Sequence, residues 1–239
     1  MDEPDGAATG NGPDARAARS PLDLLEVLAT QDVEVAPDVH HVELYTMHGL
    51  LTLVWHGPRP CEDVVLACSG AMGSLLGPAD GLYHDLGTAF TAEDIATIRV
   101  GYRRPGDLGR CVHDLAAAAQ LAAGDGARRF VAVGHSFGGA VAIQTAIVLG
   151  GLVAGVVTLA TQSAGCETAE ELGDTPLLLV HGEHDELLPP ETSLVVRELA
   201  GHGEVALLPM TGHLLRESGD EVRALLREWI PARFADAGE

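Results

Sequence analysis

Lysine is absent from this sequence, and basic residues are few: all 14 are arginine, against 35 acidic residues in a chain of 239. Without lysine, Schiff-base and lysine-assisted lyase mechanisms are excluded. The formal net charge of -21 argues against nucleic acid and anionic membranes as partners, because both would repel the chain. The acidic balance favours solubility, and adaptation to high salt is an alternative reason for it.

Aromatic residues make up only 4% of the chain, so the core must be built from valine, leucine, isoleucine and alanine. Hydrophobic residues reach 46%, and a single α/β domain of this length can bury a large core without disulfides. Paired cysteine motifs are also lacking. We therefore expect reduced, mostly buried thiols in a cytoplasmic protein, at Cys61, Cys68, Cys111 and Cys166.

Long apolar runs are missing as well. The longest, around residues 140–149, contains Gln144 and is too short to span a bilayer. No basic region followed by an apolar run opens the chain, so we expect no signal peptide. Residues 1–20 are rich in Asp, Gly, Ala and Pro and are predicted to be disordered. Residues 21–239 are predicted to form one domain.

Strands and helices alternate along most of this domain. Residues 39–48 and 50–57 are expected to form an antiparallel hairpin, preceded by a short helical turn over 22–28. Apolar runs predict strands at 63–70, 94–102, 129–136, 152–161, 176–182 and 204–210. Helices are predicted at 81–90, 108–123, 137–149, 191–200 and 220–229. This order implies a three-layer α/β fold with a mostly parallel sheet of about eight strands and a site at their carboxyl ends.

One segment carries a nucleophile motif. A buried strand runs into Gly134-His135-Ser136-Phe137-Gly138, and an apolar helix follows at once. This is G-x-S-x-G in the strand–turn–helix setting that the motif needs. The turn is so sharp that residues two positions either side of the serine approach each other, and glycine has no Cβ to collide there. The serine hydroxyl is then expected to project near the positive N-terminus of the helix.

With this motif and element order, the sequence resembles the α/β-hydrolase superfamily from about Val39 to Phe234. Its small size resembles the cap-less branches that include dienelactone hydrolases and carboxylesterases. The resemblance implies the chain order Ser, Asp, His. Asp185, after the strand PLLLVHG, matches the family's acid, with Glu183 and Glu186 as alternatives, and His213, after the last strand, matches its histidine.

These matches imply that the three residues have the catalytic roles usual in this family. Ser136 would be the nucleophile, His213 the general base, and Asp185 the group that orients the imidazole. The oxyanion hole would be the backbone N–H of Phe137 and one donor after the strand DVVLACSG, for which we expect the N–H of Ala71. The family often has His-Gly in that loop, and this chain has Ser69-Gly70 instead.

Only residues 162–175 separate the two strands between which many relatives insert a cap. We therefore expect an open or shallow site. Tyr102 and Arg103 could offer polar contacts to a substrate, or Tyr102 could simply pack the loop and Arg103 be a solvated surface charge. Beside Phe137, the apolar residues expected near the three catalytic groups are Met72, Leu187, Leu188 and Leu214.

The predicted function is cleavage of a small ester, lactone or thioester through an acyl-enzyme on Ser136. Alternatives are an acyltransferase, a perhydrolase or a biosynthetic cyclase with the same triad, or a non-catalytic ligand-binding protein of the same fold. No cofactor and no metal are expected, because His181 and His184 lie in a predicted loop without companion ligands. The expected partner is a small-molecule substrate, and association into a homodimer is possible.

Overall fold

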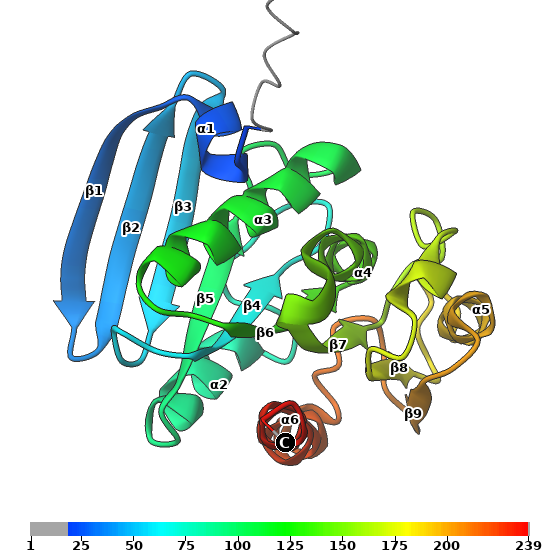
Figure 1. Ribbon diagram of the computed structural model, residues 1–239. Coiled ribbons are helices and arrows are strands. Elements are labelled where there is room, and N and C mark those ends of the chain that lie inside the picture. The colour runs from blue at the N-terminus through cyan, green and yellow to red at the C-terminus, as the bar shows by residue number, and fades with distance from the viewer. Residues whose placement is uncertain (1–18, 239) are drawn as a thin grey trace, which may run out of the picture.

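The computed structural model describes residues 19–238, so the prediction of disorder over residues 1–20 lies almost wholly outside the described residues. Within this range the strands form one nine-stranded sheet in the order β1-β2-β3-β5-β4-β6-β7-β8-β9 (Figure 1). The strands are β1 (Val27–Ala36), β2 (Val39–Thr46), β3 (Gly49–His56), β4 (Asp63–Cys68), β5 (Ile95–Gly101), β6 (Arg129–His135), β7 (Val153–Leu159), β8 (Leu177–Gly182) and β9 (Glu204–Leu208). The helices are α1 (Pro21–Leu25), α2 (Leu82–Thr91), α3 (Leu108–Gly124), α4 (Phe137–Leu149), α5 (Glu191–Ala200) and α6 (Gly219–Asp236), with single 3₁₀ turns at Gly150–Leu152 and Ala169–Leu172.

The sheet is parallel from β5 to β9 and antiparallel across β1, β2 and β3. The predicted mostly parallel α/β architecture and its antiparallel N-terminal hairpin are therefore confirmed. The described chain has one strand more than the expected eight, because β1 pairs along the outer edge of β2.

The helical turn predicted over residues 22–28 is too long at its C-terminal end. Helix α1 stops at Leu25, because Glu26 takes a left-handed conformation with φ of 52° and directs the chain into β1. Every residue of β1 is exposed, so its side chains give no clear signal of a buried face. Strand pairing with β2, rather than burial, places this segment in the sheet.

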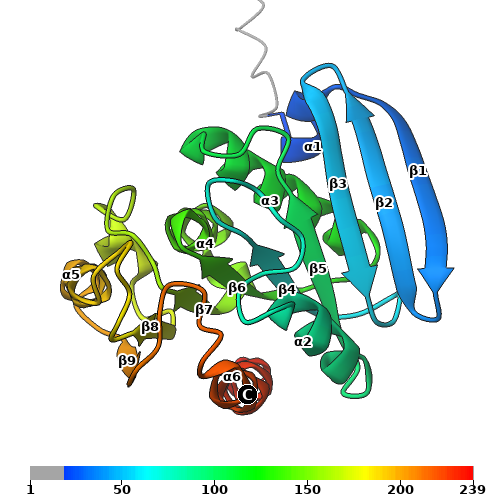
Figure 2. The same ribbon diagram turned by 180° about the vertical axis from the view of Figure 1, so that it is seen from behind.

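Helices cover both faces of the parallel strands (Figures 1 and 2). One buried cluster lies between the sheet and the face formed by α3 and α4, and it includes Leu115, Ala119 and Ile143. The other lies beneath α2 and α6 and includes Phe90 and Ile230. Because the central strands are buried on both faces, they consist almost entirely of apolar residues.

The last helix is longer than predicted. It continues past Trp229 to Asp236, with Pro231 inside it. Proline removes one helical hydrogen bond, yet Ile230 and Phe234 on either side of it are buried against the sheet, which offsets the loss. No helix in the described part of the chain is long and apolar enough to cross a membrane.

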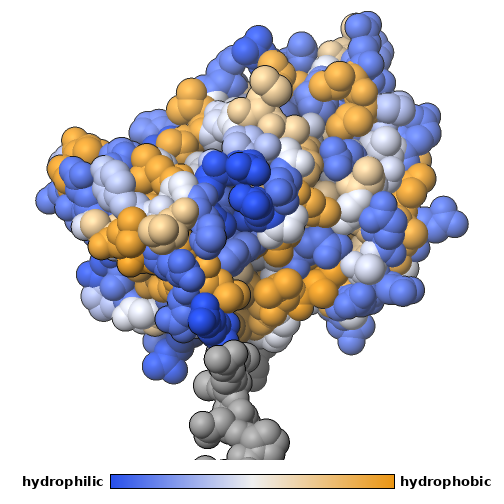
Figure 3. All heavy atoms as spheres, turned by 90° about the horizontal axis from the view of Figure 1, so that it is seen from above, coloured by the Kyte–Doolittle hydropathy of each residue, from blue (hydrophilic) through white to orange (hydrophobic). Residues whose placement is uncertain are grey.

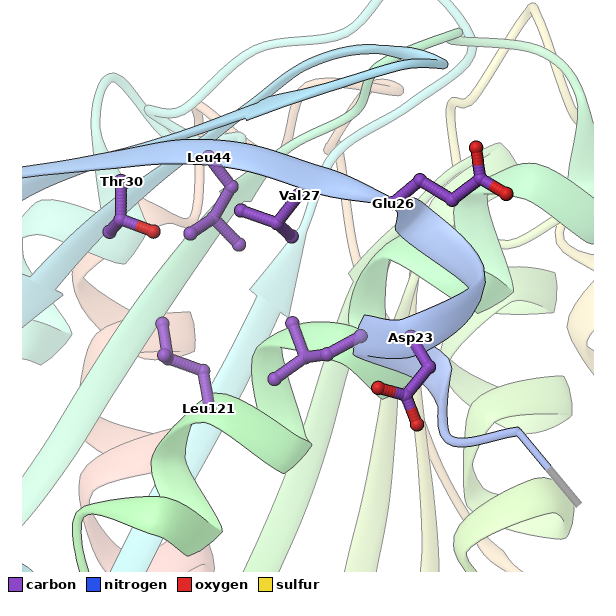
Figure 4. A pocket seen from close by; sticks show the side chains of 7 residues that line it. Asp23, Glu26, Val27, Thr30, Leu44 and Leu121 are labelled. Carbon is purple, nitrogen blue, oxygen red and sulfur yellow. The ribbon is translucent and has the colours of Figure 1, made fainter. Parts of the chain in front are cut away.

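A hollow of about 440 Å³ lies between α1, α3 and the outer strands (Figure 4). Leucine and valine side chains line part of it, and the carboxylates of Asp23 and Glu26 stand on the side of α1. Its residues come from α1, β1, β2 and α3, which carry none of the predicted catalytic groups.

Candidate active site

Ser136 occupies a strained turn between β6 and α4. Its backbone angles are φ 57° and ψ −121°, a combination that costs free energy for any residue with a side chain. The two motif glycines make the turn feasible. A Cβ on Gly134 would collide with the carbonyl oxygen of Gly138, and a Cβ on Gly138 would lie 2.6 Å from the carbonyl oxygen of Ser69. The predicted G-x-S-x-G turn therefore has the close backbone approach that requires glycine at both positions.

Asp185 and His213 meet at the same edge of the sheet. Asp185 Oδ2 lies 2.6 Å from His213 Nδ1, and the acid is buried while the histidine is half-buried. Glu183 and Glu186, the alternative acids, are both exposed. Of the three carboxylates on this loop, Asp185 is thus the one that contacts the histidine.

The turn after β8 holds Asp185 in its charged form. Burial on its own would raise the pKa of Asp185, but the backbone N–H groups of Leu188 and Leu187 and the ring of His213 outweigh it. The two N–H groups donate to Oδ1 at 2.8 and 2.9 Å respectively. The net effect lowers the pKa of Asp185, so the carboxylate stays ionised at neutral pH.

His135 connects the serine turn to the histidine loop. Its Nε2 lies 3.0 Å from the carbonyl oxygen of His213, and the two imidazole rings are 4.9 Å apart. Since a carbonyl only accepts hydrogen bonds, His135 donates from Nε2. Among the described residues no hydrogen bond joins Ser136 Oγ to His213, whose Nδ1 contacts Asp185.

Acidification is expected to destabilise the fold through His135. Burial lowers its pKa to about 4, whereas an unfolded histidine titrates near ~6.5. Between these values only the unfolded chain binds the proton, so stability falls as the pH falls from about 6.5 to about 4, by about 3 kcal/mol for this residue. Urea unfolding at several pH values measures this slope of the free energy of unfolding against pH. His135→Gln keeps a donor without titrating and should make the slope less steep, with the remainder due to His56, whose pKa burial also lowers to about 4, whereas His48→Gln on an exposed turn should leave it as steep as in the wild type.

The loop after β4 lies directly against the serine. A Cβ on Gly70 would be 3.4 Å from the Cβ of Ser136. The loop turns through a bond of 3.0 Å from Gly73 N to the carbonyl oxygen of Gly70. Within the described residues neither the N–H of Ala71 nor that of Phe137 donates to a protein acceptor. Neither predicted oxyanion donor is therefore engaged by another backbone group of the described chain.

Two buried tyrosines hold this loop where it leaves the strand. Tyr83 donates to the carbonyl oxygen of Cys68 at 2.7 Å, and Tyr102 donates to that of Ser69 at 3.1 Å. The Tyr102 ring also packs edge-on against Phe137. Arg103 is bonded to the buried carboxylate of Asp114 through both its backbone and its side chain. Tyr102 thus packs the loop, as one of its two expected roles has it, whereas Arg103, whose alternative role was a solvated surface charge, is instead paired with a buried carboxylate.

The apolar residues predicted near the site do not enclose a pocket. Met72 is 94% exposed, Leu187 69% and Leu214 44%, and Leu188 is half-buried. Leu214 lines a groove of about 350 Å³ together with residues of the 74–81 loop. Figure 3 shows the molecule from above, with strongly hydrophilic side chains near the middle of this face and apolar side chains in patches around them. Between β7 and β8 the chain forms only the short turn Ala169–Leu172, as expected for a chain without a cap.

His181 falls within the strand predicted at 176–182 but was also grouped with His184 as a loop residue, and the loop assignment is wrong. It belongs to β8, is fully buried, and its Nε2 lies 3.2 Å from Asp185 Oδ2. Its Nδ1 lies 2.6 Å from the buried hydroxyl of Ser193 at the start of α5. The available signal was a single polar residue in the otherwise apolar strand PLLLVHG, four residues before the acid.

The strand order, the glycine-flanked serine turn and the buried Asp–His pair at the carboxyl edge define the α/β-hydrolase fold. Three solved structures are similar to this chain throughout that fold. Est1E from Butyrivibrio proteoclasticus shares 16% identity at a TM-score of 0.68, with 82% of this chain and 99% of that chain covered. Dienelactone hydrolase from Anabaena variabilis shares 18% identity at a TM-score of 0.68, with 84% and 96% covered. The thioesterase domain from the curacin biosynthetic pathway shares 12% identity at a TM-score of 0.61, with 83% and 99% covered. No protein-family model and no curated protein matches the chain by sequence.

Proposed function

We propose that this protein is a serine hydrolase that cleaves a small ester, lactone or thioester through an acyl-enzyme on Ser136. The observation that carries the proposal is the strained Ser136 turn beside a loop that bears a carboxylate-bonded imidazole. The similar folds support it in part. They include a dienelactone hydrolase, a thioesterase domain, and Est1E, which has also been solved with ferulic acid bound.

The first step would be attack by Ser136. Among the described residues the hydrogen-bond partner of His213 Nδ1 is the carboxylate of Asp185, so Nδ1 carries a hydrogen, which leaves the lone pair on Nε2. Nε2 takes the Ser136 hydroxyl proton while Oγ bonds to the substrate carbonyl carbon. The carbonyl π electrons move to the oxygen, which then accepts from the N–H groups of Ala71 and Phe137. One such donor typically lowers the barrier by ~3–4 kcal/mol.

The second step would release the leaving group. The carbonyl re-forms, the bond to the alcohol or thiol breaks, and His213 returns its proton to that group. Water then attacks the acyl-enzyme in the same way, with His213 as base, and the carboxylic acid leaves Ser136. Throughout, Asp185 stabilises the imidazolium without itself taking the proton.

The exposure of the surrounding loops favours small acyl groups. Met72 and Leu187 are largely in solvent, so they offer little apolar area to a long chain. A substrate would instead be held by the oxyanion donors and by shallow contacts along the groove beside Leu214. Short aryl esters, lactones and short-chain thioesters fit this description best.

Labelling with a fluorophosphonate probe tests the proposal directly. We expect a single adduct per chain on the peptide that contains Ser136, and hydrolysis of short-chain aryl esters faster than that of long-chain ones. Ser136→Ala should abolish the labelling, and Ser20→Ala is its matched control, because within the described residues the Ser20 side chain bonds to the first turn of α1. A wild-type protein that neither reacts with the probe nor turns over any ester, lactone or thioester would overturn the proposal and favour a non-catalytic binding protein.

A further inference from the structure

The carboxylate of Asp185 bridges two imidazoles rather than one. Its Oδ2 lies 2.6 Å from His213 Nδ1 and 3.2 Å from His181 Nε2. The side chains of Asp185 and His181 are both 0% exposed, whereas that of His213 is 13% exposed. The second imidazole therefore sits behind the acid, on the side away from solvent, where no water screens its interaction.

The contacts of His181 define where its hydrogen lies. Nε2 is within 2.9 Å of the Leu188 carbonyl oxygen and 3.2 Å of the Asp185 carboxylate, and both are acceptors. Nε2 must therefore carry the hydrogen. Nδ1, 2.6 Å from Ser193 Oγ, accepts the hydroxyl hydrogen when the ring is neutral. The two acceptors at Nε2 thus fix the tautomer, and Ser193 helps to fix the orientation of the ring.

All the contacts of the carboxylate are then donors. Two backbone N–H groups bind Oδ1, from Leu187 and Leu188, and two imidazoles bind Oδ2. Donors on both oxygens fix the rotation of the carboxylate plane, so Oδ2 cannot swing away from the histidine loop. Without His181, only the more exposed His213 would hold that oxygen.

We propose that His181, oriented by Ser193, is a positioning residue for the Asp185–His213 pair. The inference rests on the proposed function, because it assigns a role in the same reaction. A donor on Oδ2 also withdraws charge from the oxygen that faces His213. Removing that donor leaves the carboxylate more basic, so it stabilises the His213 imidazolium more and the acid limb of activity moves to higher pH.

The other titratable groups around His213 are the same in the wild type and in a variant substituted at His181 alone. They are Asp185 itself, His135 at a ring separation of 4.9 Å, and His184 and Glu217 on the adjoining loops. A shift that follows substitution of His181 alone is therefore assigned to the bond between Nε2 and the carboxylate.

Two amide substitutions of His181 distinguish the role of Nδ1 from the role of Nε2. An asparagine side chain places its polar atoms near the position of Nδ1, whereas a glutamine reaches the position of Nε2. We expect His181→Asn to lower kcat about ten- to hundredfold with little change in KM, and to shift the acid limb to higher pH. His181→Gln should restore kcat to within a few-fold of wild type, with the wild-type acid limb.

Proton NMR of His213 gives a readout that needs no substrate. The downfield signal of its Nδ1–H and the titration of its ring should change in His181→Asn and persist in His181→Gln. Ser193→Ala, which keeps the His181 ring, should shift the titration of His213 in the same direction by a smaller amount. It replaces His181→Asn as the test variant if that protein does not fold.

Equal behaviour of the two amide variants, or a wild-type titration of His213 in both His181→Asn and Ser193→Ala, would overturn the positioning role. Absence of any turnover by the wild type would instead overturn the proposed function. The NMR comparison keeps the two failures distinguishable, because it reports on the Asp185–His213 pair in either case.

Discussion

Ser136→Ala should lower kcat for any ester that the protein hydrolyses by about four to six orders of magnitude, with little change in KM. The hydroxyl is the one side-chain group in the proposed mechanism that bonds to the substrate carbon, so the acyl-enzyme cannot form without it. What remains is the activity of water held near His213 and the oxyanion donors. Steady-state kinetics with a short-chain aryl ester, at protein concentrations high enough to detect slow turnover, measures the loss.

The fold of this variant should be intact. Alanine in place of Ser136 keeps the same backbone strain at φ 57°, and the serine hydroxyl donates no hydrogen bond among the described residues. Thermal unfolding should therefore give a Tm within a few degrees of the wild type. Ser20→Ala should keep full activity. A folded Ser136→Ala protein that retains more than about a tenth of wild-type kcat would rule out the serine as nucleophile.

The central part of the fold was predictable because burial requires apolar residues and the tight turn requires glycine, and both requirements are visible in the sequence. Helix α4 begins at Phe137 and ends at Leu149, as predicted, because a tight turn with glycine at 134 and 138 must precede it. The strands β6, β7 and β8 are buried on both faces, and apart from a few polar residues such as Thr158 and His181 they are built from apolar residues. Elements of this kind are identified from composition alone.

Strand β1 escaped prediction for the opposite reason. Its residues are exposed on both faces, so neither an apolar run nor a buried alternation marks it. Its position follows from hydrogen bonds to β2, which start at Val27 opposite Thr46. Backbone pairing depends on which strand is adjacent in space, and local sequence does not contain that information.

The same limit applies to the candidate site. The positions of Ser136, Asp185 and His213 after three strands place them at one edge of the sheet, since parallel strands end together. Which side chains meet there depends on ring orientations and loop paths. The bonds from His135 to the His213 carbonyl oxygen and from His181 to Asp185 are of this kind, so sequence reasoning missed both.

Asp185→Asn should lower kcat about 10⁴-fold, although it changes one atom and little of the volume. The two backbone N–H groups of Leu187 and Leu188 demand an acceptor at the position of Oδ1, so the amide oxygen must stay there. The amide NH₂ then occupies the position of Oδ2 and donates to His213 Nδ1. This forces the imidazole hydrogen onto Nε2, and the ring can no longer accept the proton of Ser136.

This reasoning predicts a signature that simple loss of charge would not give. In Asp185→Asn the His213 ring should be the Nε2–H tautomer by ¹⁵N NMR, whereas in the wild type it should be the Nδ1–H tautomer. The amide would also face His181 Nε2–H, donor against donor, so His181 must change tautomer or lose its bond, and the NMR signals of both rings should move. Glu186→Gln, an exposed carboxylate on the same loop, should leave kcat and both tautomers as in the wild type. An Asp185→Asn protein with the Nδ1–H tautomer and a kcat within tenfold of wild type would show that Asp185 does not orient the base.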